Sequence, residues 1–406
     1  MAVVLRDNHG VPPWRAKSVP PLDEEARRHV EQRSRTLAKP PGSLGRLEAL
    51  AADLAAMTGR VPPSCRRKAV VVMAADHGVV AEGVTAYPSD VTAWMVRTFV
   101  AGGAAVNVLA GQVGADVICV DVGVRGPDFA DEPAEASSPA PPGNLGPVLD
   151  RAMGSLPGAA VPARLVRARV RPGTGNIARE PAMTRREAER AITVGARLAE
   201  ELAADGIELL AGGEMGIGNT TASAAVVAAL TGLEPEGLVG PGAGLGPGGI
   251  AHKREVVRRA LACHRPNSDD PLGVLASVGG LEIGALAGLY IGAAQRRLPV
   301  VIDGVISTAA ALLAEALVPG TRHYMIAGHR SSEPAHSVAL KRLGLEPYLD
   351  LGMHLGEGTG ALLAFSLIEA ACRLIAQMDT LDRVAARAGV VHPDAVPSDP
   401  EAGGRP

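Results

Sequence analysis

The sequence Ile207-Glu-Leu-Leu-Ala-Gly-Gly-Glu-Met-Gly-Ile-Gly-Asn-Thr-Thr221 passes from a short apolar run into a glycine-rich turn. The apolar residues 207–211 predict a buried strand, and residues 222–230, which are rich in alanine and valine, predict a helix after the turn. A strand, a glycine-containing turn and a helix in this order are the repeating unit of a parallel α/β sheet. The fold class therefore depends on whether this unit recurs.

The unit recurs five more times along the chain. Each of the other apolar runs is followed by Gly, Asp, His or Asn, and usually by a helical pattern; these runs are 69–75, 117–122, 163–170, 299–302 and 322–327. Six units predict an α/β fold with a doubly wound, mostly parallel sheet of about six strands. Ligands bind such sheets at the carboxyl ends of the strands, so the polar residues after each run are candidates for a site.

The two ends of the chain depart from this pattern. The proline-rich residues 1–20 predict a mobile arm, and residues 21–60 predict the helical part of a small domain. The large α/β domain is expected over 61–345, with a disordered insertion at 126–147 that is rich in Pro, Ala and Ser. Residues 346–390 are expected to hold a candidate catalytic loop and C-terminal helices that complete the small domain, before a disordered tail at 391–406.

Composition argues against several classes of protein. The net charge of −3, the pI near 6.4 and the 2% aromatic content argue against nucleic-acid binding, which uses basic surfaces and stacking platforms. Apolar runs stay shorter than the ~18–20 residues of a membrane span without charges and glycines, and the N-terminus lacks a signal pattern. We therefore expect a cytoplasmic protein without a membrane span. The cysteines are far apart, which favours reduced thiols over structural zinc: Cys65, Cys119, Cys263 and Cys372.

The sequence Leu351-Gly-Met-His-Leu-Gly-Glu-Gly-Thr-Gly360 places one carboxylate, that of Glu357, between glycines just before an apolar helix expected at 359–378. An unpaired carboxylate near a core is costly. A general base, by contrast, gains from apolar surroundings, which raise the pKa of a carboxyl group toward neutrality. The alternative is a residue at the start of a helix, favoured by the helix dipole. Position alone leaves both interpretations open.

The turn at 212–221 is a candidate phosphate-binding loop. Its glycines allow successive backbone N–H groups to point at an anion, and the N-terminus of the following helix adds positive potential. Asn219, Thr220 and Thr221 can donate side-chain hydrogen bonds or cap the helix. The alternative is a plain β–α turn. The loop is not a Walker loop, because no Gly-Lys-Ser/Thr follows.

Three further clusters carry polar groups. The glycine run 240–249 leads to Lys253 and Arg254, and it is equally consistent with a phosphate-binding loop and with a surface loop. The sequence at 76–78, Asp-His-Gly, suggests a metal site or an acid–base pair, although a structural role fits at least as well. Asp303 and the hydroxyls of residues 328–334 are placed after strands, where they suit a phosphate or a ribose.

Taken together, these segments resemble the nicotinate-nucleotide:dimethylbenzimidazole phosphoribosyltransferase family. The matching stretches follow the family's order over residues 22–380: KPPGSLGRLE (39–48), DHGV (76–79), EGV (82–84), GGAAVNVL (102–109), GEMGIGNTT (213–221), GGLEI (279–283), DG (303–304), GHRSSEP (328–334) and LGEGTG (355–360). Each motif alone is weak, but the ordered set is specific. The fold that the resemblance implies is Rossmann-like.

The resemblance implies transfer of phosphoribose from nicotinate mononucleotide to a benzimidazole, with no metal or other cofactor, by a homodimer that assembles the cobalamin nucleotide. It also implies roles for individual residues. Glu357 would be the catalytic base. The phosphate and ribose contacts would come from Glu214, Gly216, Gly218, Asn219, Lys253, Asp303 and Ser331, and the base pocket from Tyr87, Met95 and Leu355.

Two alternatives remain open from the residues. A non-catalytic nucleotide-binding regulator would need the phosphate loop but would have no use for Glu357. A transferase for another acceptor would differ in the base pocket, because adenine needs more hydrogen-bond partners and a phenol needs few beyond Glu357.

Overall fold

The computed structural model describes residues 12–126 and 160–389. The predicted insertion, apart from Gly126, and the predicted tail at 391–406 lie outside the described residues. The described chain divides into two compact units, of which the first contains residues 12–22 and 65–367 and the second contains residues 23–64 and 368–389. Helix α14 (Thr359–Gln377) begins in the first unit and ends in the second.

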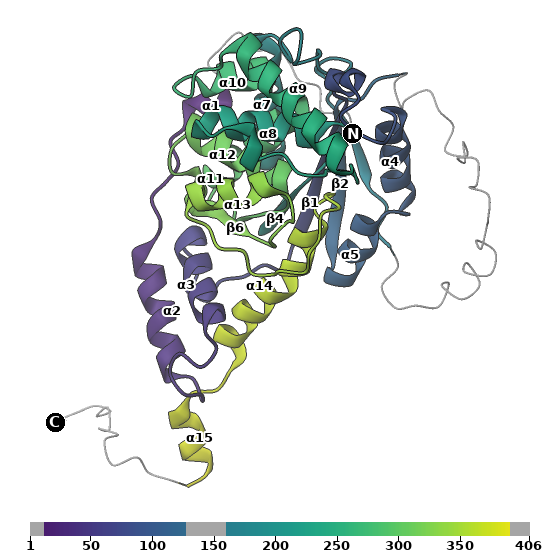
Figure 1. The fold of residues 1–406 in the computed structure, drawn as a ribbon. Helices are drawn as coiled ribbons and strands as arrows, with labels where there is room; N and C mark the ends of the chain where they lie inside the picture. Colours follow the sequence, from purple (N-terminus) through teal and green to yellow (C-terminus); the bar gives the residue numbers. More distant parts are fainter. Residues whose placement is uncertain (1–11, 127–159, 390–406) are drawn as a thin grey trace, which may run out of the picture. The chain divides into compact units, whose positions relative to one another are not determined.

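The first unit is built on a six-stranded sheet in which all neighbouring strands are parallel (Figure 1). The strand order is β3-β2-β1-β4-β5-β6. The strands are β1 (Lys68–Ala75), β2 (Ala115–Gly123), β3 (Arg164–Arg167), β4 (Leu209–Met215), β5 (Val300–Ile302) and β6 (Met325–Ala327). The direction of winding reverses between β1 and β4, which confirms the predicted doubly wound fold and leaves a crevice at the carboxyl ends of these two strands.

Two strands have boundaries that differ from the prediction. β4 continues to Met215, so Gly212, Gly213 and Glu214 belong to the strand, because the ladder with β1 runs as far as the Ala74–Met215 pair. β6 begins only at Met325, because the residues before it form a 3-10 turn, η3 (Thr321–Tyr324). Both boundaries depend on pairing with neighbouring strands, which short apolar runs do not encode.

Helix α11 (Leu281–Ala294) is buried along its whole length. It contacts β1, β2 and β4, and it also packs against α7 (Arg185–Ala204) and α12 (Val305–Leu317). The contact with α7 is close because it uses glycines: a Cβ added to Gly288 would lie 2.7 Å from the carbonyl carbon of Ile192. A helix surrounded on all sides is apolar on all sides, as the sequence of α11 is.

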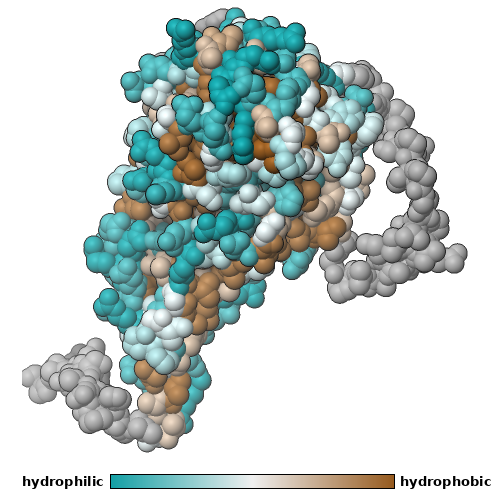
Figure 2. All heavy atoms as spheres, viewed as in Figure 1, coloured by the Kyte–Doolittle hydropathy of each residue, from teal (hydrophilic) through white to brown (hydrophobic). Residues whose placement is uncertain are grey.

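Helices α4 (Asp90–Ala101) and α5 (Ala105–Val113) lie on the side of the sheet away from α7, α11 and α12 (Figure 1). Further helices surround the site end of the sheet: η1 (Gly78–Glu82), α8 (Asn219–Thr231), η2 (Pro235–Gly237), α9 (Pro247–His264), α10 (Pro271–Val278) and α13 (Pro334–Leu343). Hydrophilic side chains gather over α9 in Figure 2. α7 begins with a capping box in which Thr184 accepts a hydrogen bond from the backbone N–H of Glu187.

Residues 12–20 differ from the prediction of a mobile arm. They include helix α1 (Pro13–Ala16), and the indole of Trp14 is only 2% exposed. Gln295, just after α11, donates hydrogen bonds from its Nε2 to the carbonyl oxygens of Trp14 (3.0 Å) and Lys17 (2.6 Å). The segment is therefore attached to the first unit by one buried aromatic ring and by backbone hydrogen bonds.

Gln295→Ala should lower the free energy of unfolding by about 1–2 kcal/mol, because it leaves two backbone carbonyls of the N-terminal segment without their donor. Thermal unfolding followed by circular dichroism measures the loss. Gln112→Ala, at an exposed position on α5, is the matched control and should leave Tm unchanged. Equal Tm values for the two variants would contradict the attachment.

The second unit is helical and combines N- and C-terminal segments, as predicted. It contains α2 (Glu24–Thr36), α3 (Arg46–Thr58), the end of α14 and α15 (Leu381–Arg387). Arg33 on α2 donates to the carbonyl oxygens of Ile375 (3.1 Å) and Met378 (3.0 Å), which joins the two ends of the chain. Hydrogen bonds from Lys39 and Ser34 oppose the effect of burial on Glu48 and lower its pKa to about 2.

Two segments are long and apolar enough to cross a membrane by length and composition alone: 90–113 and α14. The first is two helices, because Gly102 adopts a left-handed conformation that ends α4. In α14, 56% of the apolar window is buried inside the protein. These segments are therefore helices of the folded core.

Candidate active site

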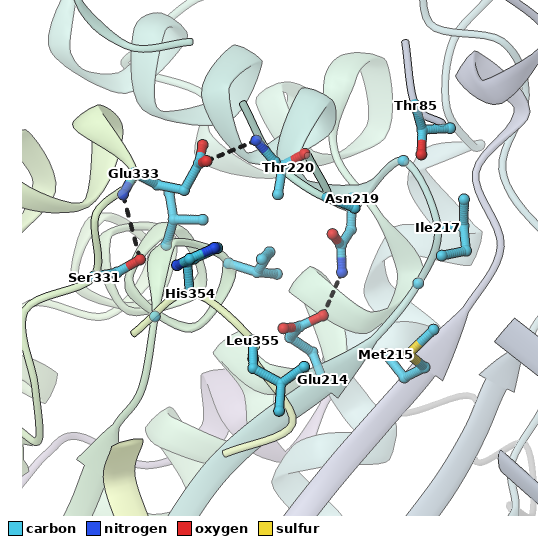
Figure 3. A pocket seen from close by; sticks show the side chains of 18 of the residues that line it. Thr85, Glu214, Met215, Ile217, Asn219, Thr220, Ser331, Glu333, His354 and Leu355 are labelled. Atoms are coloured by element: carbon cyan, nitrogen blue, oxygen red, sulfur yellow. Dashed lines mark hydrogen bonds between the residues drawn. The ribbon is translucent and has the colours of Figure 1, made fainter. Parts of the chain in front are cut away.

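A cleft opens at the carboxyl ends of the strands, beside the point where the strand order reverses. It contains about 800 Å³ of space, its opening to solvent included, which is within the range of roughly 300–1,000 Å³ typical of small-molecule sites. Figure 3 shows Glu214 and Asn219 opposite Ser331, Glu333 and His354, with Leu355 nearby. The lining comes from segments far apart in the sequence: 84–85, 214–220, 242–243, 304–306, 329, 331, 333 and 354–356.

The turn between β4 and α8 forms one wall of the cleft. Gly218 has a φ of +95° and ends the turn, so α8 begins at Asn219, three residues earlier than predicted. Gly216 has no room for a side chain, because a Cβ would collide with the carbonyl oxygen of Ala75. The hydroxyl of Thr92 accepts a hydrogen bond from the N–H of Ile217 (3.1 Å) and fixes the turn. The wall is thus a helix N-terminus with closely approaching backbone, which suits an anion.

Glu214 is buried beside this turn and accepts a hydrogen bond from the side chain of Asn219 (Figure 3). Burial raises the pKa of Glu214 to about 8, and the negative charges of Asp303 and Glu282 act in the same direction. The carboxyl group is therefore mostly protonated at pH 7. In that state it does not repel a phosphate and can donate a hydrogen bond.

Lys253 reaches the opposite end of the same turn from α9. Its ammonium group is buried and donates to the hydroxyl of Thr220 (2.7 Å) and to the carbonyl oxygen of Gly240 (3.4 Å). Burial lowers the pKa of Lys253 to about 8, although the nearby carboxylate of Glu333 opposes that effect. Glu333 also accepts from the N–H of Gly242 (2.7 Å), which attaches part of the glycine run to the cleft. Sequence analysis does not single out Glu333, although it lies within the GHRSSEP motif.

Glu357 lies on the loop before α14 with a φ of +63°, a left-handed conformation that is rare for a residue with a side chain. Its side chain is buried, and Oε2 has no hydrogen-bond partner among the described residues. Burial raises the pKa of Glu357 to about 7; the N–H of Val106 opposes this effect, and the charge of Asp303 adds to it. Its neighbours Leu355 and Gly356 line the cleft, so the carboxyl group is placed at the edge of the cleft.

The structure brings together most of the residues predicted to form the site. Glu214, Gly216, Gly218, Asn219, Ser331 and Leu355 line the cleft, and Lys253 contacts the lining residue Thr220. Asp303 is buried behind the cleft rather than lining it. Among the described residues of α4 and the segment before it, Tyr87 is half exposed and Met95 is half-buried, and neither lines the cleft.

The Asp76-His77-Gly78 cluster supports the structure. His77 Nε2 pairs with Glu282 Oε1 at 2.8 Å, both side chains being buried, and Asp76 accepts a hydrogen bond from the N–H of Arg125 (2.8 Å). Gly78 packs against the backbone of Gly175 without room for a Cβ. In the described parts of the chain, no group of three or more His, Cys, Asp or Glu side chains is arranged to hold a metal ion. The structure therefore favours the structural interpretation.

Comparison with known proteins gives one consistent result. The family model described as "Phosphoribosyltransferase" matches residues 19–386. The chain is 49% identical to the nicotinate-nucleotide–dimethylbenzimidazole phosphoribosyltransferase of Chloroflexus aggregans (strain MD-66 / DSM 9485), over 91% of this chain and 95% of the relative. The enzyme of the same name from Roseiflexus sp. (strain RS-1) is also 49% identical, over 89% of this chain and 93% of the relative.

A solved structure is similar over nearly the same length. The crystal structure of CobT from Thermus thermophilus has a TM-score of 0.77 and 47% sequence identity, and the match covers 91% of this chain and 99% of that chain.

Proposed function

The chain belongs to the phosphoribosyltransferase family, and from that membership we propose that it transfers phosphoribose from nicotinate mononucleotide to 5,6-dimethylbenzimidazole. The products would be α-ribazole 5′-phosphate and nicotinate, and the reaction would assemble the cobalamin nucleotide. The names of the relatives supply the two substrates. The cleft supplies groups suited to each part of the reaction.

The phosphate of the donor would bind at the N-terminus of α8. The backbone amides at Gly216–Asn219, the ammonium group of Lys253 and the hydroxyl of Ser331 are the donors available there. The protonated carboxyl of Glu214 would bind beside them without repelling the dianion. Fixing the phosphate orients the reacting carbon, and orientation of this kind contributes several kcal/mol to catalysis, roughly 7–11 in the most favourable systems.

The bond changes need no acid for the leaving group. The bond between the ribose C1′ and the pyridinium nitrogen breaks, and its electron pair neutralises the positive charge on that nitrogen, so nicotinate leaves as a neutral ring. One nitrogen of the benzimidazole forms the new bond to C1′ from the opposite face, which inverts the β-configuration to α. The proton on the other benzimidazole nitrogen then needs a base.

Glu357 is the base that we propose. The observation that carries this assignment is the unpaired oxygen of a buried carboxyl group next to the cleft lining. A carboxyl group with a pKa of about 7 is half ionised at neutral pH, so it can accept a proton and release it again.

The pH dependence of kcat/KM should be bell-shaped, with a maximum between about pH 7 and pH 8. Activity should rise as pH increases through about 7, because Glu357 must lose its proton to act as a base. It should fall above about pH 8, because Lys253 loses its positive charge and Glu214 gains a negative one. A profile that is flat between pH 6 and pH 9 would contradict these assignments; steady-state rates in a constant-ionic-strength buffer measure it.

Nicotinate release from nicotinate mononucleotide tests the function directly. We expect release that depends on added dimethylbenzimidazole and yields equal amounts of nicotinate and α-ribazole phosphate. Release with a phenol or with adenine, but not with dimethylbenzimidazole, would identify the other acceptor class. Binding of nicotinate mononucleotide without release, for every azole and phenol tested, would favour the nucleotide-binding regulator.

Two further expectations rest on family membership. We expect a homodimer, which light scattering on the purified protein would measure, and a cytoplasmic location, which cell fractionation would test.

A further inference from the structure

Asp303 contacts the loop that carries Glu357 rather than the cleft. The residue follows β5 and is 2% exposed. Its Oδ2 accepts a hydrogen bond from the N–H of Gly358 (3.2 Å), and its Oδ1 accepts one from the N–H of Ala361 (2.9 Å). These two amides lie one and four residues after Glu357, at the N-terminus of α14. Asp303 therefore caps α14 from a different part of the chain.

The loop needs such support because its backbone is strained. Glu357 has a φ of +63°, and the glycines on either side of it, Gly356 and Gly358, both have a φ of +87°. A left-handed conformation costs a residue with a side chain roughly 1–2 kcal/mol. Such strain persists only when the surrounding structure fixes it. The two hydrogen bonds to Asp303 act directly on the residues that follow Glu357.

Asp303 is itself held by its neighbours. Its backbone N–H donates to the hydroxyl of Ser307 (2.9 Å), and His329 Nε2 lies 3.4 Å from its Oδ1. The ring of His329 also contacts Gly360, where a Cβ would collide with it. The chain of contacts therefore runs from β5 and β6 into the Glu357 loop.

We propose that Asp303 is a positioning residue that holds the Glu357 loop in its active conformation, and that it does not bind the ribose. The proposal rests on the proposed function of Glu357 as general base. The alternative, a ribose hydroxyl bound to Asp303, would need an oxygen that faces the cleft. Asp303 does not line the cleft, and both of its oxygens already accept backbone amides.

The negative charge of Asp303 has a second effect on Glu357. It contributes to the raised pKa of Glu357, after burial and against the N–H of Val106. The other ionisable groups near Asp303 and Glu357 are Glu214 on β4, Glu282 on α11, His329 after β6 and His336 on α13. Removing the charge of Asp303 should therefore move the acidic limb of the pH profile to lower pH.

Asp303→Asn is the main test, because it keeps the size of the side chain but replaces one acceptor oxygen with an N–H donor. We expect kcat for nicotinate release to fall about 100-fold, as for a small displacement of a catalytic group, with KM for nicotinate mononucleotide changed by less than about threefold. The acidic limb should also shift to lower pH. A large rise in KM with little change in kcat would assign Asp303 to the ribose and overturn the proposal.

A double-mutant cycle separates the two roles further. If Asp303 acts through Glu357, then Asp303→Asn should cost almost nothing in the Glu357→Gln background, and the double variant should be as slow as Glu357→Gln alone. If Asp303 binds the substrate, the two losses should multiply. Multiplied losses would overturn the proposal.

Two controls keep the result interpretable. Asp121→Asn is matched, because Asp121 is also buried, also lies at the end of a sheet strand and also accepts a backbone amide, that of Val124 (2.8 Å). It should leave kcat and the pH profile unchanged. If Asp303→Asn does not fold, Asp303→Glu keeps the charge but moves the oxygens by one methylene, and it should lower kcat with KM unchanged.

Hydrogen exchange provides a readout that does not depend on activity. In Asp303→Asn the amides of Gly358 and Ala361 should exchange faster than in the wild type, whereas in Asp121→Asn they should not. Unchanged exchange at both amides would overturn the proposal. Wild-type protein that releases no nicotinate with any acceptor would instead contradict the proposed function, and the exchange experiment would still test the contact.

Discussion

Glu357→Gln should lower kcat for nicotinate release by about 10²–10⁴-fold, which is the usual contribution of a positioned general base. Glutamine has the shape of glutamate, but its amide cannot accept the benzimidazole proton. KM for nicotinate mononucleotide should change little, because the phosphate-binding groups lie on β4, α8 and α9 rather than on the Glu357 loop. The pH profile should also lose its acidic limb.

The matched control for this variant is Glu369→Gln, which makes the same change further along α14 and outside the cleft lining. It should keep the wild-type rate. Tm of Glu357→Gln should be no lower than that of the wild type, since the variant removes a buried carboxyl group whose Oε2 has no partner within the described structure. Release that survives in Glu357→Gln would move the proton transfer to another group or to water.

Gly213→Ala should lower kcat by about 100-fold or more, although the added methyl group is small and touches no substrate. A Cβ at this position would lie 2.5 Å from the carbonyl carbon of Glu357 and 2.6 Å from the amide nitrogen of Gly358. Those atoms are backbone and cannot rotate away. β4 cannot shift either, because Gly213 is paired with Val72 of β1. The Glu357 loop must therefore move away from its position.

Steady-state kinetics beside calorimetric binding of nicotinate mononucleotide would measure this effect. We expect binding to be retained while turnover is lost, since the phosphate-binding turn begins after Gly213. Gly237→Ala is the control, because Gly237 has an ordinary φ and no atom within 4 Å of an added Cβ. A Gly213→Ala variant with the wild-type kcat would contradict the close packing of β4 against the loop.

The local features of this protein are encoded in its sequence. Six apolar runs, each followed by a turn, predict the α/β class and six strands, because strand and helix periodicities are properties of neighbouring residues. The capping box at Thr184 and the glycine turn after β4 can be read in the same way. The glycines around Glu357 mark that residue as a candidate, because glycine is needed where the chain adopts a left-handed conformation.

The properties of the site depend on contacts that only the fold creates. Asp303 caps a helix that begins 56 residues later along the chain (359 − 303), and Lys253 reaches the cleft from α9. The pKa values of Glu214, Lys253 and Glu357 move toward neutrality because folding buries them among one another. Burial and Coulomb interactions act through space, so sequence spacing does not report them. The sequence by itself therefore determined the fold class and the candidate residues, and the tertiary structure decided which of them meet and in which protonation state.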